Sequence, residues 1–200
     1  MKKTVFFDLE TGGLTPGVHP IIQFAGIAVD EKFKVQEELE IKLQFDIGEC
    51  TAEALAVNSF DPEVWEKESF SQISGMKVIS AFLKRHATVK LISKRGSPYY
   101  VALMAGHNAS NFDGPMLQAW YKKADEFLPG YFRVLCTSQL AQWHFYNHPN
   151  PPENMKLGTL CRYFGVHLSE QAAHDALADV RANVKLARVL LEGRTISEPV

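Results

Sequence analysis

Residues 6–14 read FFDLETGGL, an apolar run that ends in two carboxylates and two glycines. Residues 5–7 are β-branched or aromatic, which predicts a strand. Side chains alternate along a strand, so Asp8 and Glu10 point to one side of its end, about 7 Å apart. Two like charges this close are costly unless a cation neutralises them, and hard divalent ions favour carboxylate oxygens. The stretch therefore predicts a metal site; the alternative is that both acids are solvated where the strand ends.

The rest of the chain alternates between strands and helices, without a repeat, a low-complexity tract or a linker that would divide it. β-branched and aromatic runs predict strands at residues 5–7, 21–29, 38–45, 99–104 and 132–136. Apolar spacings of three and four predict helices at residues 51–57, 73–85, 114–121, 138–146, 157–164 and 170–191. Three strands followed by further helices and strands predict an α/β fold with a mixed sheet flanked by helices.

Composition limits the class of protein. The chain has 200 residues, of which 46% are hydrophobic, enough for one domain with a sizeable core. Its net charge of -2 gives no overall positive field and argues against a clamp that holds duplex nucleic acid irrespective of sequence. Three cysteines without a CxxC pair indicate buried reduced thiols. No targeting segment and no run of about 18 apolar residues is present, so we expect a cytoplasmic protein without a membrane span.

A second motif follows the fourth expected strand. Residues 106–113 read GHNASNFD, which places Asp113 at a junction between a strand and a helix. Aspartate is among the commonest residues that cap a helix N-terminus, so capping is the alternative to a role in chemistry.

A third motif, HDALADV at residues 174–180, lies inside the last expected helix. His174 and Asp179 are five residues apart and therefore lie near one side of the helix start. Asp179 is close to the packed face, where a carboxylate is costly to bury without a partner. The other motifs suggest a metal ion as that partner. His167, seven residues before His174, is interpreted as structural or solvated.

Two further stretches are expected to be surface loops. The segment from Lys84 to Gly96 is basic and rich in turn residues, and residues 148–152 read HPNPP. The basic segment Lys84–Arg95 is either a solvated loop or a contact for nucleic acid or a partner.

The three motifs, in this order, resemble those of the DEDDh branch of the DEDD exonuclease superfamily, and the resemblance spans nearly the whole chain. It implies a ribonuclease H-like fold with a mixed five-stranded sheet, an exonuclease domain over residues 1–193 and a short tail over residues 194–200. The sister branch has a tyrosine four residues before the last aspartate, where this chain has Asp175. The residues that match the four metal-binding acids are Asp8, Glu10, Asp113 and Asp179, and His174 matches the histidine of the branch.

The resemblance also implies a mechanism: two Mg²⁺ ions per site, with Mn²⁺ as a substitute, and His174 as general base. Backbone N–H groups of Thr11 and Gly12 are expected to meet a terminal 3′-hydroxyl. Leu14 matches a side chain that wedges between the last two bases, with core packing as the alternative. Asn108 either contacts the strand or orders its loop.

The implied activity is removal of mononucleotides from a free 3′ end of nucleic acid, with single-stranded DNA favoured over RNA. The spacing His-Asn-x-x-x-Phe-Asp is similar to that of the Trex-like members, which favours a free-standing enzyme and is compatible with a homodimer. Two alternatives stay open: an exoribonuclease that trims RNA ends, and a nucleic-acid-binding protein with a retired active site. Presence of all five matching residues argues against the second.

Overall fold

The computed structural model describes residues 2–58, 60–168 and 175–192. Its centre is one sheet with the strand order β3-β2-β1-β5-β4, and β6 pairs with β5. The strands are β1 (Lys3–Thr11), β2 (Ile21–Asp30), β3 (Val35–Lys42), β4 (Ala87–Ile92), β5 (Pro98–Gly106) and β6 (Leu135–Cys136). β5 runs parallel to β1 and β6, and the other neighbours are antiparallel. The expected mixed α/β sheet is confirmed, but it has six strands instead of five.

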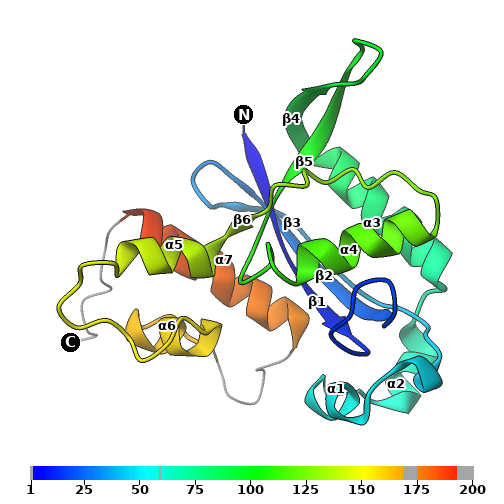
Figure 1. The fold of residues 1–200 in the computed structure, drawn as a ribbon, viewed down its shortest axis with the longest axis horizontal. Coiled ribbons are helices and arrows are strands. Elements are labelled where there is room, and N and C mark those ends of the chain that lie inside the picture. Colours follow the sequence, from blue (N-terminus) through cyan, green and yellow to red (C-terminus); the bar gives the residue numbers. More distant parts are fainter. Residues whose placement is uncertain (1, 59, 169–174, 193–200) are drawn as a thin grey trace.

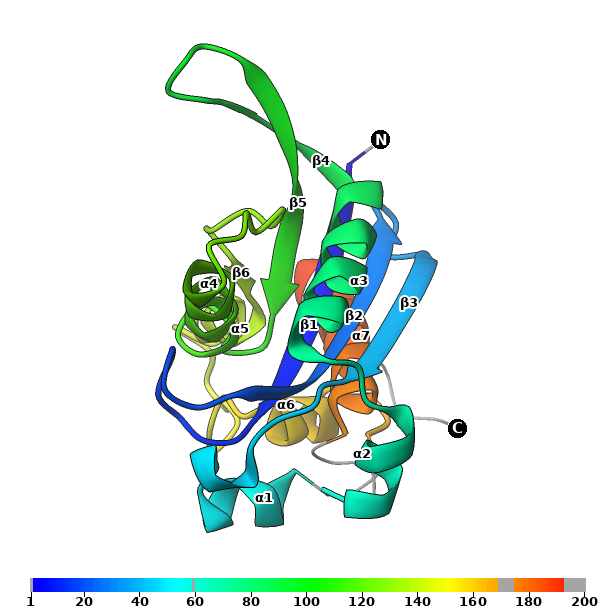
Figure 2. The same ribbon diagram turned by 90° about the vertical axis from the view of Figure 1, so that its right-hand side faces the viewer.

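Helices cover both faces of this sheet (Figures 1 and 2). The longer helices α3 and α4 lie on one face, and α7 lies on the other beside α5 and α6. The bounds are η1 (Ile47–Glu49), α1 (Ala52–Val57), α2 (Pro62–Glu68), α3 (Gln72–Arg85), α4 (Asp113–Lys123), α5 (Thr137–His144), α6 (Leu157–Tyr163) and α7 (Ala176–Glu192). None of the helices in the described ranges is long and apolar enough to cross a bilayer.

Strand β1 is the central strand that positions the first pair of acids. Phe7 packs in the cluster formed with α3 and α4, whereas Phe6 packs with the apolar side chains of α7. Because side chains alternate along the strand, Asp8 and Glu10 share the side of Phe6. Both carboxylates therefore face α7.

The expectation that residues 84–96 form a surface loop is wrong. Lys84 and Arg85 end α3, and residues 87–92 form the edge strand β4. Lysine is tolerated on an edge strand because its charge discourages pairing with another chain. This is why the cationic residues concealed a strand pattern. In contrast, residues 148–152 lie outside helices and strands, as expected.

Two helices also differ from expectation. The short helix α2 was not predicted, although Asp61 caps it through Glu63 N–H and Pro62 occupies its first turn. The last helix was expected to start at residue 170, but Asp175 lies outside it and accepts a hydrogen bond from Ala178 N–H at 2.8 Å. This contact caps the N-terminus of α7, and the helix begins at Ala176. Residues 170–174 lie outside the described residues.

The three cysteines are free, in agreement with the expectation of reduced thiols. Cys136 and Cys161 are buried, as expected, whereas Cys50 is only partly buried.

The contact between α3 and α4 supplies a stability prediction. Tyr121 is 1% exposed, and its hydroxyl donates to Met76 O at 3.2 Å and lies 2.8 Å from Ser80 Oγ. Tyr121→Phe keeps the ring but leaves these buried groups without that partner. We expect a loss of about 1–2 kcal/mol in the free energy of unfolding, measured by urea denaturation. An unchanged or higher value would contradict this.

Candidate active site

Asp113 comes from the strand–helix junction and reaches β1. It is the first residue of α4 and is buried, and Leu9 N–H donates to its Oδ1 at 3.1 Å. The β1–β5 ladder ends at Phe6, so Asp113 accepts from an N–H group beyond that ladder. The N-cap of α4 is Phe112, without a side-chain capping bond. The capping alternative for Asp113 therefore does not account for its position.

Asp179 reaches the same place from α7, which packs on the β1–β2 face. Its charge acts on both Glu10 and Asp8, which raises their pKa values. Acids from three elements, β1, α4 and α7, are thus brought together although up to 171 positions separate them in the chain, from Asp8 to Asp179. The structure therefore juxtaposes the four acids named from the sequence.

Burial raises the pKa values of three of these acids, Asp8, Glu10 and Asp113, and neighbouring acids add to the shift of the first two. Burial is the largest cause of the raised pKa of Asp8, and the charges of Asp113, Glu10 and Asp179 add to it. Burial followed by the charges of Asp179 and Asp113 raises the pKa of Glu10 to about 8. Burial raises the pKa of Asp113 to about 7. The site therefore disfavours four negative charges, as expected for a cluster that a cation would neutralise.

These shifts predict that the metal-free protein becomes less stable as pH rises. The folded-state pKa values lie above the unfolded ones, so the folded chain binds more protons between about pH 4 and pH 8. Raising the pH through this window removes protons that the folded state holds more tightly. In EDTA, we expect the free energy of unfolding to fall by several kcal/mol between about pH 5 and pH 8. Urea denaturation across this range measures it.

Glu10→Gln is the matched variant for this prediction because it removes one charge with little change in shape. The free energy of unfolding of this variant should fall less steeply with pH than that of the wild type. A wild-type profile that is flat or rises across the same range would show that the cluster is not under electrostatic strain.

The donor set fits a hard divalent cation, since carboxylate oxygens are the ligands that Mg²⁺ and Mn²⁺ prefer. Within residues 2–58, 60–168 and 175–192, no three His, Cys, Asp or Glu side chains are arranged to hold one metal ion as they stand. The chemistry of the donors, and not their present arrangement, supports a metal site.

The loop after β1 contains the residues expected to meet the end of a strand. Thr11 and Gly12 are buried, and Gly12 N–H donates to Pro20 O at 2.8 Å. The Gly12 N–H is thus already engaged, and a bond to a 3′-hydroxyl would have to share or replace it. Leu14 is 79% exposed, which excludes core packing as its role.

Asn108 has an ordering role that the structure makes explicit. It adopts a left-handed backbone with φ of 57°, and its Oδ1 accepts from Asn111 Nδ2 at 3.0 Å. Its neighbour His107 donates from Nε2 to Met155 O at 2.8 Å, and burial lowers the pKa of this imidazole. A neutral histidine thus ties the loop to residue 155. Asn108 is still exposed and lines a cavity, so both roles named from the sequence remain compatible with its position.

That cavity, of about 730 Å³, opens beside Asp179. It lies between the loop of Asn108 and helices α5, α6 and α7. Lys156 and Arg162 are exposed on its wall and give it positive charge, and Asp179 is the one member of the four acids that lines it. Sequence reasoning missed both cations, because each stands singly and outside the three motifs; only the folding of α6 toward α7 brings them to the site.

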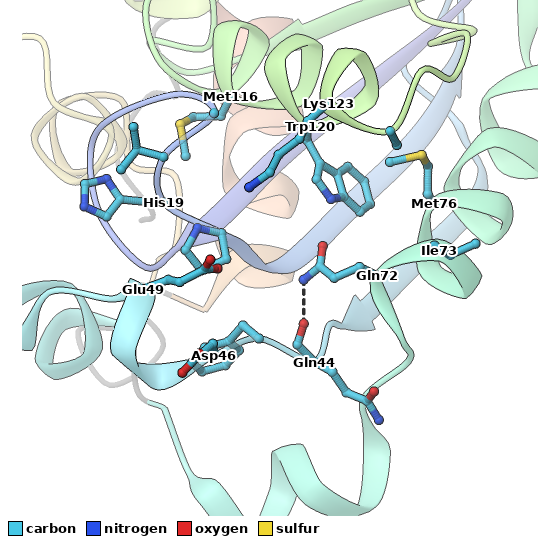
Figure 3. A pocket seen from close by; sticks show the side chains of 15 residues that line it. His19, Gln44, Asp46, Glu49, Gln72, Ile73, Met76, Met116, Trp120 and Lys123 are labelled. Carbon is cyan, nitrogen blue, oxygen red and sulfur yellow. Dashed lines mark hydrogen bonds between the residues drawn. The ribbon is translucent and has the colours of Figure 1, made fainter.

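A second cavity, of about 510 Å³, lies elsewhere (Figure 3). It is enclosed by the β1–β2 loop, the segment before η1, and helices α3 and α4, with Trp120 and Met76 on its wall. Gln72 donates to Gln44 O at 2.6 Å across one side of it (Figure 3). The four acids, all within the described residues, do not line this cavity. Among its lining residues the acids are Asp46 and Glu49, whereas the four acids named from the sequence converge at Asp8, so we place the candidate active site there.

His174, the fifth matching residue, lies outside the described residues. Its neighbour Asp175 is exposed at the start of α7, and the charge of Asp175 contributes to the raised pKa of Glu10.

Comparison with solved structures identifies the fold as that of an exonuclease, and specifically that of exonuclease I. E. coli exonuclease I in complex with a dT13 oligonucleotide is 19% identical, with a TM-score of 0.74 over 95% of this chain and 41% of that chain. An exonuclease I from Methylocaldum szegediense is 19% identical, with a TM-score of 0.74 over 98% and 42%. The zinc-bound form of the E. coli ExoI–ssDNA complex is 18% identical, with a TM-score of 0.74 over 97% of this chain and 41% of that chain.

At these identities the likeness establishes the fold. The chain spans about two fifths of the length of each of these exonuclease I chains. No protein-family model matches the sequence, and no curated protein matches it.

Proposed function

We propose that the chain is a metal-dependent 3′→5′ exonuclease that releases mononucleotides from the 3′ end of single-stranded DNA by phosphodiester hydrolysis. The observation that carries this proposal is the meeting of Asp8, Glu10, Asp113 and Asp179 near the C-terminal end of β1, where burial raises the pKa values of Asp8, Glu10 and Asp113 and neighbouring acids add to the shifts of Asp8 and Glu10. The exonuclease I fold supports it. The proposed exonuclease domain comprises residues 1–193, with a tail over residues 194–200 that lies outside the described residues.

The proposed cofactor is a pair of Mg²⁺ ions, for which Mn²⁺ can substitute. Asp8, Glu10, Asp113 and Asp179 would hold these ions through their carboxylate oxygens. When bound, the ions would neutralise the acids, acidify a water molecule and stabilise the charge of the leaving oxygen. Solved structures of exonuclease I include a zinc-bound complex with single-stranded DNA, which supports metal binding by this fold.

The protein side chains would position the strand end. Lys156 and Arg162, on the wall of the cavity beside Asp179, supply positive charge for backbone phosphates. The exposed Leu14 is available to stack on a base, a contact that tolerates any sequence. Asn108 would hold the strand on the other side of the cavity, from a loop that its own hydrogen bonds order.

The substrate is proposed to be DNA because solved structures of exonuclease I with the same fold contain dT13 and dA16 oligonucleotides. The alternative substrate is RNA, which a protein distinguishes through the 2′-hydroxyl. A nucleic-acid-binding protein without activity is the alternative of another class. A homodimer would be compatible with the proposed exonuclease and with each of these alternatives.

The proposal is tested by incubating single-stranded DNA and RNA of one sequence with the protein in Mg²⁺, Mn²⁺ or EDTA and measuring released mononucleotides. We expect release from DNA in both metals and none in EDTA. Release from RNA alone would replace the proposal with an exoribonuclease. Binding without release in any metal would favour the inactive nucleic-acid-binding protein.

A further inference from the structure

The hairpin formed by β4 and β5 (residues 87–106) projects from the body of the molecule (Figures 1 and 2). Its turn is closed by hydrogen bonds: Ser93 N–H donates to Ser97 O at 2.9 Å, and Gly96 N–H donates to Ser93 O at 2.9 Å. Gly96 has a φ of 81°, as expected for a three-residue hairpin loop with its last residue in the left-handed region. The turn is therefore a defined structure that holds Lys94 and Arg95 at the outer end.

The hairpin carries unbalanced positive charge. The sequence has no Asp or Glu between Lys84 and Asp113. At the base, Arg85 and His86 are paired with Glu37 on β3. The three cations farther out, Lys90, Lys94 and Arg95, are exposed, and among the described residues no acid lies within ion-pair distance of them. The outer part of the hairpin is thus a cationic arm on a chain whose net charge is -2.

One side of the hairpin adds apolar surface to this charge. Lys90 is paired across the ladder with Tyr100, and Ile92 is paired with Pro98, so these four residues share a side. Tyr100 is 55% exposed and Ile92 is 62% exposed. The other side is partly covered, since Tyr99 contacts the ring of Phe127 at a centroid distance of 5.9 Å. The exposed side therefore combines the Tyr100 ring with Lys90, and the turn beyond it adds Lys94 and Arg95.

Such a combination suits a strand of nucleic acid better than an acidic protein. Phosphates repeat along a strand and attract successive cations, and exposed aromatic rings stack on bases of any sequence. A cationic hairpin with an exposed ring can use both kinds of contact at once.

The hairpin lies at the opposite end of β5 from the acids. β5 is parallel to β1, so Pro98 lies at the far end while Gly106 lies beside the candidate active site. Nine residues of strand separate these ends by roughly 26 Å at about 3.3 Å per residue. Tyr100 shares the side of Ala102 and Met104, which pack with α3 and α4, whereas Asp8 and Glu10 face α7, so the strand must also pass from one side of the sheet to the other. At about 3.4 Å per nucleotide, a stacked strand needs about eight nucleotides for the length of β5 alone. A substrate of about three nucleotides bound at the acids cannot reach the hairpin.

We propose that the exposed side of the β4–β5 hairpin, with Lys90, Lys94, Arg95 and Tyr100, is a second contact for the nucleic-acid strand whose 3′ end occupies the candidate active site. This inference rests on the proposed exonuclease function and adds a substrate-length preference to it. Substrates that reach the hairpin bind more tightly, whereas trinucleotides depend on the acids and their cavity alone.

The test compares the double variant Lys94→Glu/Arg95→Glu with the wild type. Both are measured in EDTA for binding to labelled single-stranded DNA of about three and about 25 nucleotides over a range of salt concentrations. We expect the affinity of the variant for the long strand to fall at least about tenfold at low salt. The slope of log affinity against log salt should become shallower by about 1.4, from two lost phosphate contacts. Trinucleotide hydrolysis in Mg²⁺ should be unchanged.

The matched control is Lys32→Glu/Lys34→Glu, which reverses two exposed charges in the β2–β3 turn at the same end of the sheet. It makes the same change in net charge, so its effect measures the general field alone. If the hairpin variant behaves like this control, the inference is overturned while the proposed function stands. If the wild type binds long DNA through the hairpin but releases no nucleotide in any metal, the proposed function fails and the contact remains. Tyr100→Ala should weaken long-strand binding without changing the salt slope.

Discussion

Asp8→Asn is expected to reduce the rate of nucleotide release by more than about a hundredfold. Asp8 lies at the centre of the cluster, since the charges of Asp113, Glu10 and Asp179 all act on it. Even residues that only support a metal ligand typically cost 10–100-fold when they are replaced, so loss of a ligand itself should cost more. The measurement is the initial rate at saturating Mg²⁺, with the fold checked by circular dichroism.

The same variant should not destabilise the metal-free protein at pH 8. Asn has nearly the shape of Asp and removes one charge from a site in which burial and like charges raise the pKa values of Asp8 and Glu10. We expect a free energy of unfolding in EDTA equal to or above that of the wild type. Lower activity with preserved stability separates a role in chemistry from a role in folding.

Asp175→Asn is the control for Asp8→Asn because it removes the same charge from an exposed residue at the start of α7. Its side chain accepts a hydrogen bond from Ala178 N–H, which asparagine can also accept. Its rate should remain near that of the wild type. Equal losses in the two variants would mean that net charge near the site, and not the position of Asp8, governs activity.

His174→Ala is expected to lose a factor of about 10²–10⁴ in turnover, the range typical of general acid–base catalysis. An unperturbed histidine with a pKa near 6.5 is mostly able to accept a proton at neutral pH, which is the role proposed for His174. Binding of Mn²⁺, measured by calorimetry, should be retained, since the four acids remain. Activity of the wild type should fall in acid as this histidine becomes protonated.

His167→Ala is the matched control because His167 is exposed and precedes His174 by seven residues. This control should keep its turnover. Near-normal turnover of His174→Ala would exclude this residue as the general base, whatever its effect on metal affinity.

Much of the site could be predicted from local pattern. The run of residues 6–14 indicated both the strand and the direction of its two acids, because alternation along a strand is a local property. The predicted α/β class is also confirmed. Local pattern failed at β4, where cations needed on an edge strand resembled a solvated loop. Local pattern also could not decide whether Asp113 caps a helix or takes part in chemistry. The hydrogen bond from Leu9 N–H to Asp113 forms only through a tertiary contact.

Other features required the fold itself. Burial around Glu10 and Asp113, which dominates their raised pKa values, arises only when α7 and α4 pack on the sheet. The cavity lined by Lys156 and Arg162 forms between helices that are distant in sequence from β1. Engagement of Gly12 N–H by Pro20 O likewise follows from the closure of the β1–β2 loop. Sequence spacing alone contains none of these contacts.

The most direct test of the central claim uses one single-stranded DNA oligonucleotide labelled on its 3′-terminal nucleotide and the same oligonucleotide labelled on its 5′ end, both with Mg²⁺. For the wild type, we expect the 3′ label to appear at once as a mononucleotide while the 5′-labelled strand shortens stepwise. Asp8→Asn should give neither product. Release of the 5′ label first, internal cleavage, or equal activity of Asp8→Asn would contradict the account.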